Sequence, residues 1–187
     1  MTPSINSIPA VAFVGKQNSG KTTLLEKLIA ALSDRGVRVA TVKHHSHAGF
    51  DFDIEGKDSW RHRQAGSAHT VIAAPDQIAS VRTLTREVEL REIIDMMTHD
   101  ATIIGDAPSL ILVEGYRHAG IPTIELFRAG NPADEARDLG GEGNQIVGVV
   151  TDILRIKEQA KSQDLPTFPF NNPAPLADFL TERFINS

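Results

Sequence analysis

The sequence predicts an α/β fold, in which helices cover both faces of a mainly parallel, twisted sheet. Two observations support this class. Apolar runs typical of buried strands alternate along the chain with stretches whose apolar residues recur at helical spacing. The chain also opens with a strand pattern at residues 11–14, a helical pattern at 22–35 and a second strand pattern at 37–42, which together form a βαβ unit with parallel strands.

The elements of this first unit each have a local signal. Residues 11–14 are continuously apolar, as in a strand that is buried on both faces. The helix at 22–35 ends before Gly36, and glycine is the residue type that most often follows a helix C-terminus. The apolar face of the helix consists of Leu24, Leu25, Leu28, Ile29 and Leu32.

The middle of the chain predicts two short strands between two helices. A polar loop follows the second strand, and residues 57–65 form a short helical pattern with Asp58 near its start. Residues 69–74 and 78–84 have strand composition and are separated by Pro-Asp-Gln, a sequence that suits a turn. Residues 86–97 carry apolar residues at helical spacing, so we expect a helix there.

The last part of the chain contains the strongest strand signal, the apolar run within residues 109–116. A further strand is predicted at 123–128, and the Gly-rich acidic segment at 129–145 is expected to be a mobile loop. Residues 146–152 predict the last strand of the sheet, and residues 171–184 predict a C-terminal helix.

Length and composition exclude several classes of protein. A chain of 187 residues suits a single domain over residues 1–187 with a core of ordinary size. A formal charge of -5 argues against general affinity for nucleic acid or an anionic membrane. The absence of cysteine removes disulfides and thiolate metal sites. Because the first ten residues lack a signal-peptide pattern and no apolar run approaches about 18 residues, we expect a cytoplasmic protein without a membrane span.

The break between the first strand and the first helix has the sequence of a phosphate-binding P-loop. It matches the pattern G-x-x-x-x-G-K-[ST] between a strand and a helix, which is the context that the motif requires. Backbone N–H groups and the helix N-terminus favour phosphate oxygens, Lys21 supplies a cation with a catalytic role, and the Thr22 hydroxyl suits Mg²⁺. The fold is therefore predicted to be that of a P-loop NTPase. The predicted nucleotide-binding residues are Gly15, Lys16, Gln17, Asn18, Ser19, Gly20, Lys21, Thr22 and Thr23.

Carboxylates near the ends of other strands complete this predicted site. Glu114 follows four apolar residues, where an unpaired buried charge would be costly, so we expect it to hold Mg²⁺ or its waters. Asp53, preferred over Asp51, lies in the loop after the second strand and is expected to orient water, with a catalytic role, or to complete the magnesium shell. Asp152 follows the last strand, where it would either pair with the guanine edge or cap a helix. The predicted ligands are GTP and Mg²⁺.

Three histidines, His44, His45 and His47, lie close together after the second strand. Imidazole is a common ligand of transition metals, so the cluster is compatible with such a site. Because cysteine is absent and a fourth ligand is not evident, solvent-exposed histidines or phosphate contacts are the stronger interpretation.

Together these motifs resemble the MobB family of molybdopterin-guanine dinucleotide biosynthesis adaptor proteins. The resemblance rests on "VKHHSHAGFDFDIEGKDSWRHRQAG" at residues 42–66 as well as on the P-loop. It continues in "LILVEGY", "IPTIELFR", "VVTD" and the terminal "ADFL", and so spans nearly the whole chain. The sequence departs from the family pattern at Glu55, where proline is usual, and at Ser46, which replaces a clustered histidine.

The resemblance implies a homodimeric GTP-binding protein that hydrolyses GTP weakly. Such an adaptor assists a MobA-type guanylyltransferase, which joins GMP from GTP to molybdopterin in molybdenum cofactor biosynthesis, while direct binding of molybdopterin is left open. In the wider class a lysine after the first glycine can act across a dimer, which makes Lys16 a candidate for that role. In the segment at 42–66, Lys57, Arg61 and Arg63 are expected to present cations to an anionic ligand.

Two other functions are compatible with the same motifs. The histidine cluster favours a metal-insertion GTPase. A small-molecule kinase that uses ATP would need an arginine-bearing lid, which Arg61, Arg63 or the segment around Arg137 would have to supply. A preference for ATP, or turnover stimulated by a small acceptor, would distinguish the kinase from a GTP-binding adaptor.

Overall fold

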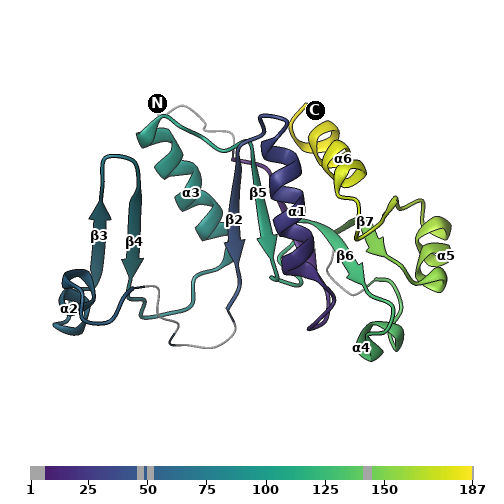
Figure 1. The fold of residues 1–187 in the computed structure, drawn as a ribbon, viewed down its shortest axis with the longest axis horizontal. Helices are drawn as coiled ribbons and strands as arrows, with labels where there is room; N and C mark the ends of the chain where they lie inside the picture. The colour runs from purple at the N-terminus through teal and green to yellow at the C-terminus, as the bar shows by residue number, and fades with distance from the viewer. Residues whose placement is uncertain (1–6, 46–48, 50–52, 141–144, 187) are drawn as a thin grey trace. The chain divides into compact units, whose positions relative to one another are not determined.

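The computed structural model describes residues 7–45, 49, 53–140 and 145–186, and the chain divides into two compact units (Figure 1). The larger unit comprises Met1–His44 and Leu90–Ser187, and the smaller unit comprises His45–Glu89. Each unit has its own sheet. Within the described ranges, no helix combines the length and the apolar composition that a membrane span requires.

The larger unit is built on a six-stranded sheet in the order β2-β5-β1-β6-β7-β8, and each neighbouring pair is parallel. Parallel strands end at the same edge of a sheet, so the loops that follow them meet there. The arrowheads of β2, β5 and β6 point toward this edge in Figure 1. The strands are β1 (Ala10–Val14), β2 (Val39–Lys43), β5 (Leu110–Glu114), β6 (Pro122–Phe127), β7 (Gln145–Thr151) and β8 (Thr167–Phe168).

Helices cover both faces of this sheet because the central strands direct buried side chains to two sides. Val11 and Phe13 of β1 pack in a core with α1 and α6, whereas Ala12 and Val14 pack in a second core with α3 on the opposite face. On that opposite face α5 packs beside β6 and β7. The helices are α1 (Lys21–Ser33), α3 (Leu90–Ile104), α4 (Pro132–Glu135), α5 (Leu154–Ser162) and α6 (Ala174–Phe184).

The smaller unit contains one helix and one hairpin. The helix is α2 (Asp58–Gln64), and the hairpin consists of the antiparallel strands β3 (His69–Ala73) and β4 (Ile78–Arg82). The turn between the strands is closed by Ala74 N, which donates to Gln77 O at 2.8 Å. The two strands therefore pair with each other instead of joining the parallel sheet.

The structure confirms the predicted α/β class, with a mainly parallel sheet and helices on both faces. The boundaries predicted for the helix at 86–97 are wrong, because α3 begins at Leu90 and continues to Ile104. Its last turns contain polar residues that end the sequence pattern but not the helix. The hydroxyls of Thr98 and Thr102 each donate at 2.9 Å to the carbonyl four residues earlier, which satisfies these side chains within the helix.

Three elements of the larger unit were not predicted. Helix α5 has few apolar residues, of which Ile156 and Ala160 are buried, so its sequence pattern is weak. Strand β8 is two residues long, and it extends the sheet beyond β7, so the strand predicted at 146–152 is not the last one. Helix α4 lies within the segment at 129–145 that was expected to be a mobile loop.

Replacing Leu28 by alanine should lower the free energy of unfolding by about 2–5 kcal/mol. Leu28 of α1 is fully buried in the core. Alanine would leave a cavity there that the surrounding residues fill only in part. The matched control is Leu154→Ala on α5, where the side chain is 70% exposed and the expected change is within about 0.5 kcal/mol. Urea unfolding followed by circular dichroism measures both. Equal losses in the two variants would contradict this description of the core.

Candidate nucleotide-binding site

The P-loop connects the end of β1 to the start of α1, at the edge where the parallel strands end. Two of its residues have left-handed backbone conformations, Gly20 with φ of 81° and Asn18 with φ of 64°. Gly15 is required for a different reason, because a side chain at this position would come within 3.1 Å of the carbonyl oxygen of Leu126. The loop is therefore curled tightly against β6.

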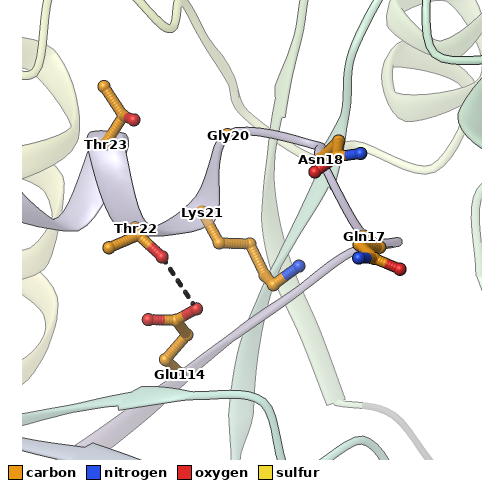
Figure 2. A pocket seen from close by; sticks show the side chains of 7 residues that line it. All are labelled: Gln17, Asn18, Gly20, Lys21, Thr22, Thr23 and Glu114. Atoms are coloured by element: carbon orange, nitrogen blue, oxygen red, sulfur yellow. Dashed lines mark hydrogen bonds between the residues drawn. The ribbon is translucent and has the colours of Figure 1, made fainter.

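Lys21 extends from the start of α1 along the inside of this loop, as Figure 2 shows. Its Nζ donates to the carbonyl oxygen of Gly15 at 3.1 Å and to that of Lys16 at 2.8 Å. Burial lowers the pKa of the Lys21 ammonium group below its ordinary value, while the nearby carboxylates of Glu114 and Asp134 oppose that shift. The ammonium group is thus held within the loop and is partly shielded from solvent.

The P-loop lines an open hollow of about 470 Å³, a volume within the range of small-molecule sites. Its lining residues are Gln17, Asn18, Gly20, Lys21, Thr22, Thr23 and Glu114 (Figure 2). Three residues of the predicted P-loop set, Gly15, Lys16 and Ser19, are not among the lining residues. Ser19 is fully buried and directs its side chain into the protein, and Lys16 is exposed, so its role across a dimer stays a prediction.

Glu114, the last residue of β5, lies opposite Thr22. Thr22 Oγ1 donates to Glu114 Oε1 at 3.0 Å, the contact drawn as a dashed line in Figure 2. Lys43 Nζ lies 3.8 Å from the other carboxylate oxygen, Oε2. A hydroxyl and a carboxylate are oxygen donors of the kind that Mg²⁺ prefers, so the chemistry of this pair fits that ion. The structure thus brings together two of the three predicted metal ligands.

The third predicted ligand, Asp53, belongs to the smaller unit. Its Oδ1 accepts hydrogen bonds from Ile54 N at 2.9 Å and from Ser59 Oγ at 3.0 Å, and so it stabilises the turn before α2. Its predicted role with water or Mg²⁺ stays a prediction. Asp51 and His47 lie outside the described residues.

His44 lies beside Glu114. Its backbone N donates to Glu114 O at 2.9 Å, and its ring contacts that of Tyr116 with centroids 4.6 Å apart. Gly115, between Glu114 and Tyr116 in the sequence, has φ of 97°. A side chain at this position would come within 3.1 Å of the Cβ atom of His44. In the part of the chain that the structure describes, no group of three or more His, Cys, Asp or Glu side chains is placed to hold a metal ion.

Asp152 lies one residue after β7, at the same edge of the sheet. Its Oδ1 accepts a hydrogen bond from Ala129 N at 2.6 Å, and its Oδ2 lies 3.5 Å from Nε of Arg128. The carboxylate therefore connects the end of β7 to the segment after β6. Its role in guanine recognition stays a prediction. The helix that follows, α5, has Ile153 and not Asp152 as its N-cap residue.

A buried acidic residue that the sequence analysis missed supports the P-loop from behind. Asp134 of α4 is fully buried, and its Oδ2 accepts a hydrogen bond from Ser19 Oγ at 2.6 Å. The same oxygen accepts from Asn131 Nδ2 at 3.0 Å and from Arg128 N at 3.1 Å. Asn131 Nδ2 also donates to Gln17 O at 2.9 Å. The segment after β6 thus holds the P-loop through both a side chain and a carbonyl group.

Arg137 neutralises this buried carboxylate and links it to a second one. Its Nε and Nη2 donate to Asp134 Oδ1 at 3.2 Å and 3.1 Å, and its Nη1 forms an ion pair with Glu125 of β6. Its guanidinium carbon lies 3.7 Å from the centroid of the Phe127 ring. The Arg137 side chain is 16% exposed, so it is largely buried in this cluster. Glu125 is fully buried.

The sequence carried a signal for part of this cluster. Glu125 interrupts the apolar pattern of residues 123–128, and a charge within such a pattern needs a partner. Asp134 had no comparable signal, because it lies in a segment rich in glycine and acidic residues that is typical of exposed loops.

The chain is similar to characterised proteins over most of its length. The profile of the family described as "Molybdopterin guanine dinucleotide synthesis protein B" matches residues 10–152. The "Molybdopterin-guanine dinucleotide biosynthesis adapter protein" of Escherichia coli (strain K12) is 35% identical over 178 residues, which cover 94% of this chain and 93% of that protein. A protein of the same kind from Bacillus subtilis (strain 168), named as probable, is 32% identical over 173 residues, or 90% of each chain.

Solved structures share the fold. The crystal structure of Bacillus subtilis MobB matches with a TM-score of 0.71 at 24% identity, over 96% of this chain and 99% of that chain. HypB from Helicobacter pylori, solved in complex with nickel, matches with a TM-score of 0.54 at 15% identity, over 95% of this chain and 87% of that chain. At these identities the likeness shows the fold alone, which is that of P-loop NTPases, as the sequence predicted.

Replacing Asp134 by asparagine should lower the free energy of unfolding by about 3 kcal/mol, because it leaves the buried charge of Arg137 with one carboxylate fewer. The matched control is Asp138→Asn, which removes an ion pair between Arg155 and an aspartate that is 74% exposed. That change should cost less than about 1 kcal/mol. Urea unfolding of both variants measures the difference, and similar losses would argue against a supporting role for Asp134.

Phosphate affinity should fall at alkaline pH as Lys21 loses its proton. Burial lowers the pKa of Lys21 below 10.5, so the attraction is complete at lower pH and is lost as the pH rises through the lowered pKa. Calorimetry with tripolyphosphate between about pH 7 and about pH 10 measures this loss. Lys21→Met is the control, because methionine has no titrating ammonium group and its weaker tripolyphosphate binding should not show this pH dependence. The same pH dependence in both proteins would exclude Lys21 as the source.

Proposed function

The chain belongs to the molybdopterin guanine dinucleotide synthesis protein B family, and we propose that it is a GTP-binding adaptor with weak GTPase activity. Its place in molybdopterin guanine dinucleotide biosynthesis follows from the family, whose Escherichia coli member is named an adapter protein. In this proposal it assists a MobA-type guanylyltransferase in attaching GMP to molybdopterin. We further propose a homodimer in the cytoplasm, as the resemblance and the composition imply.

The observation that carries GTP binding is the placement of Lys21, Thr22 and Glu114 around one hollow. An ammonium group, a hydroxyl and a carboxylate at these positions are the groups with which P-loop proteins hold a triphosphate and Mg²⁺. Thr22 and Glu114, whose Oγ1 and Oε1 atoms are 3.0 Å apart, would hold the ion or its waters. Mg²⁺ bound there supplies positive charge to the phosphate oxygens.

Each residue has a distinct task in this proposal. The N–H groups of the P-loop and the N-terminus of α1 favour phosphate oxygens. Lys21 exchanges its two carbonyl partners for oxygens of the terminal phosphates. Asp53 orients the attacking water, Asp152 accepts hydrogen bonds from the guanine edge, and Lys16 reaches the nucleotide of a second subunit. Catalysis is then mainly electrostatic positioning, in keeping with slow hydrolysis.

Lys21→Ala should weaken GTP binding by at least about tenfold, because charge-assisted hydrogen bonds to phosphate are lost. Lys27→Ala is the matched control, since it removes the same charge from an exposed position of α1 and should leave the affinity unchanged. Calorimetry with GTP and with ATP, in the presence of magnesium, measures both variants.

Two results would contradict the proposal. Equal GTP affinity in the Lys21→Ala and Lys27→Ala proteins would place the nucleotide elsewhere. A preference for ATP, or hydrolysis stimulated by a small acceptor, would favour the kinase alternative.

A further inference from the structure

Arg128 contacts two side chains at the carboxyl edge of the sheet, Phe170 and Asp152. Its guanidinium carbon lies 4.6 Å from the centroid of the Phe170 ring, and its Nε lies 3.5 Å from Asp152 Oδ2. The side chains of Arg128 and Asp152 are 45% and 42% exposed. A ligand that approaches from solvent can therefore reach both of these contacts.

These residues adjoin the P-loop. An ideal Cβ atom placed on Gly20 would lie 3.7 Å from the Phe170 ring, so this ring borders the start of α1. Asp152 directly follows β7, and Ala129 N orients its carboxylate by donating to Oδ1 at 2.6 Å. An aromatic ring and an oriented carboxylate thus lie close to the segment that lines the phosphate hollow.

The two side-chain contacts of Arg128 resemble those that a guanine base makes, a stacked ring and a carboxylate partner. A guanidinium group is planar, stacks on aromatic rings and donates N–H groups to carboxylates. Guanine presents an N–H and an amino group side by side on a planar ring, whereas adenine has an acceptor in place of that N–H. Stacking on Phe170 and donation to Asp152 are therefore interactions that a guanidinium and a guanine can make alike.

We propose that Phe170 completes the guanine subsite of Asp152 by stacking on the base, and that Arg128 competes with the base for both contacts. This inference deepens the proposed GTP binding and rests on it. On entry the guanine ring replaces the guanidinium on Phe170, and its N–H donors replace Arg128 at Asp152. A side-chain movement suffices for this exchange, because Arg128 N is held separately by Asp134 Oδ2 at 3.1 Å.

Calorimetry with two probes separates base binding from phosphate binding. GTP engages both parts of the site, whereas tripolyphosphate has no base, so the ratio of the two affinities isolates the subsite. Phe170→Leu should lower this ratio by about tenfold, because leucine keeps an apolar side chain but removes the stacking face. Phe170→Trp is the matched control and should keep the ratio.

Arg128→Ala should raise the same ratio by about threefold or more, because the competing group is gone. Arg128→Lys controls for charge, since it keeps a cation at this position but lacks the planar fork, and it should raise the ratio as well. The tripolyphosphate affinity of each variant accounts for any change in phosphate attraction. Circular dichroism checks that each variant is folded.

The outcomes distinguish this inference from the proposed function. An unchanged ratio of GTP to tripolyphosphate affinity in Phe170→Leu, or a lower ratio in Arg128→Ala, would overturn the subsite. Either result leaves the proposed GTP binding intact if the wild-type protein still binds GTP through Lys21. Failure of the wild-type protein to bind either probe would overturn the proposed GTP binding and the subsite together. A second readout is fluorescence of Phe170→Trp in a Trp60→Phe background, which GTP should quench and tripolyphosphate should not.

Discussion

The hydrogen bond from Ser19 to Asp134 is the contact on which the shape of the P-loop depends. A loop that directs its amides toward a ligand cannot use the same amides to fix its own conformation, so side chains must do so. Ser19 donates to a fully buried carboxylate at 2.6 Å, and Arg137 balances the charge of that carboxylate. The segment after β6 therefore supports the candidate nucleotide site, although the hollow itself is lined by the P-loop and β5.

The parallel sheet explains why residues far apart in the sequence act together. Four of the strands end at one edge of the sheet. The P-loop follows β1, Glu114 is the last residue of β5, and Arg128 and Asp152 directly follow β6 and β7. Since both faces of the central strands are packed with apolar side chains, this edge is where polar groups can gather without a desolvation cost. The fold positions the groups, and the loops determine which groups they are.

Local patterns made part of this structure predictable. The P-loop and the buried strands have short-range signals, and Glu114 was recognised because a charge follows an apolar run. Asp134 could not be found in this way, because its partner Ser19 is 115 residues away and acidic residues in a Gly-rich segment usually face solvent. Helix α5 was missed for a related reason, since few apolar residues mark its buried side.

Lys21 donates two hydrogen bonds to its own loop, and a ligand has to compete with these carbonyl acceptors. A ligand gains from this side chain when it supplies acceptors that are better than the carbonyls of Gly15 and Lys16. A shorter polyphosphate whose last oxygens fall short of the ammonium group leaves those internal bonds in place and gains nothing from the charge. In the proposed GTP complex, the phosphate oxygens would therefore have to displace two carbonyl groups that already accept hydrogen bonds from the Lys21 ammonium group.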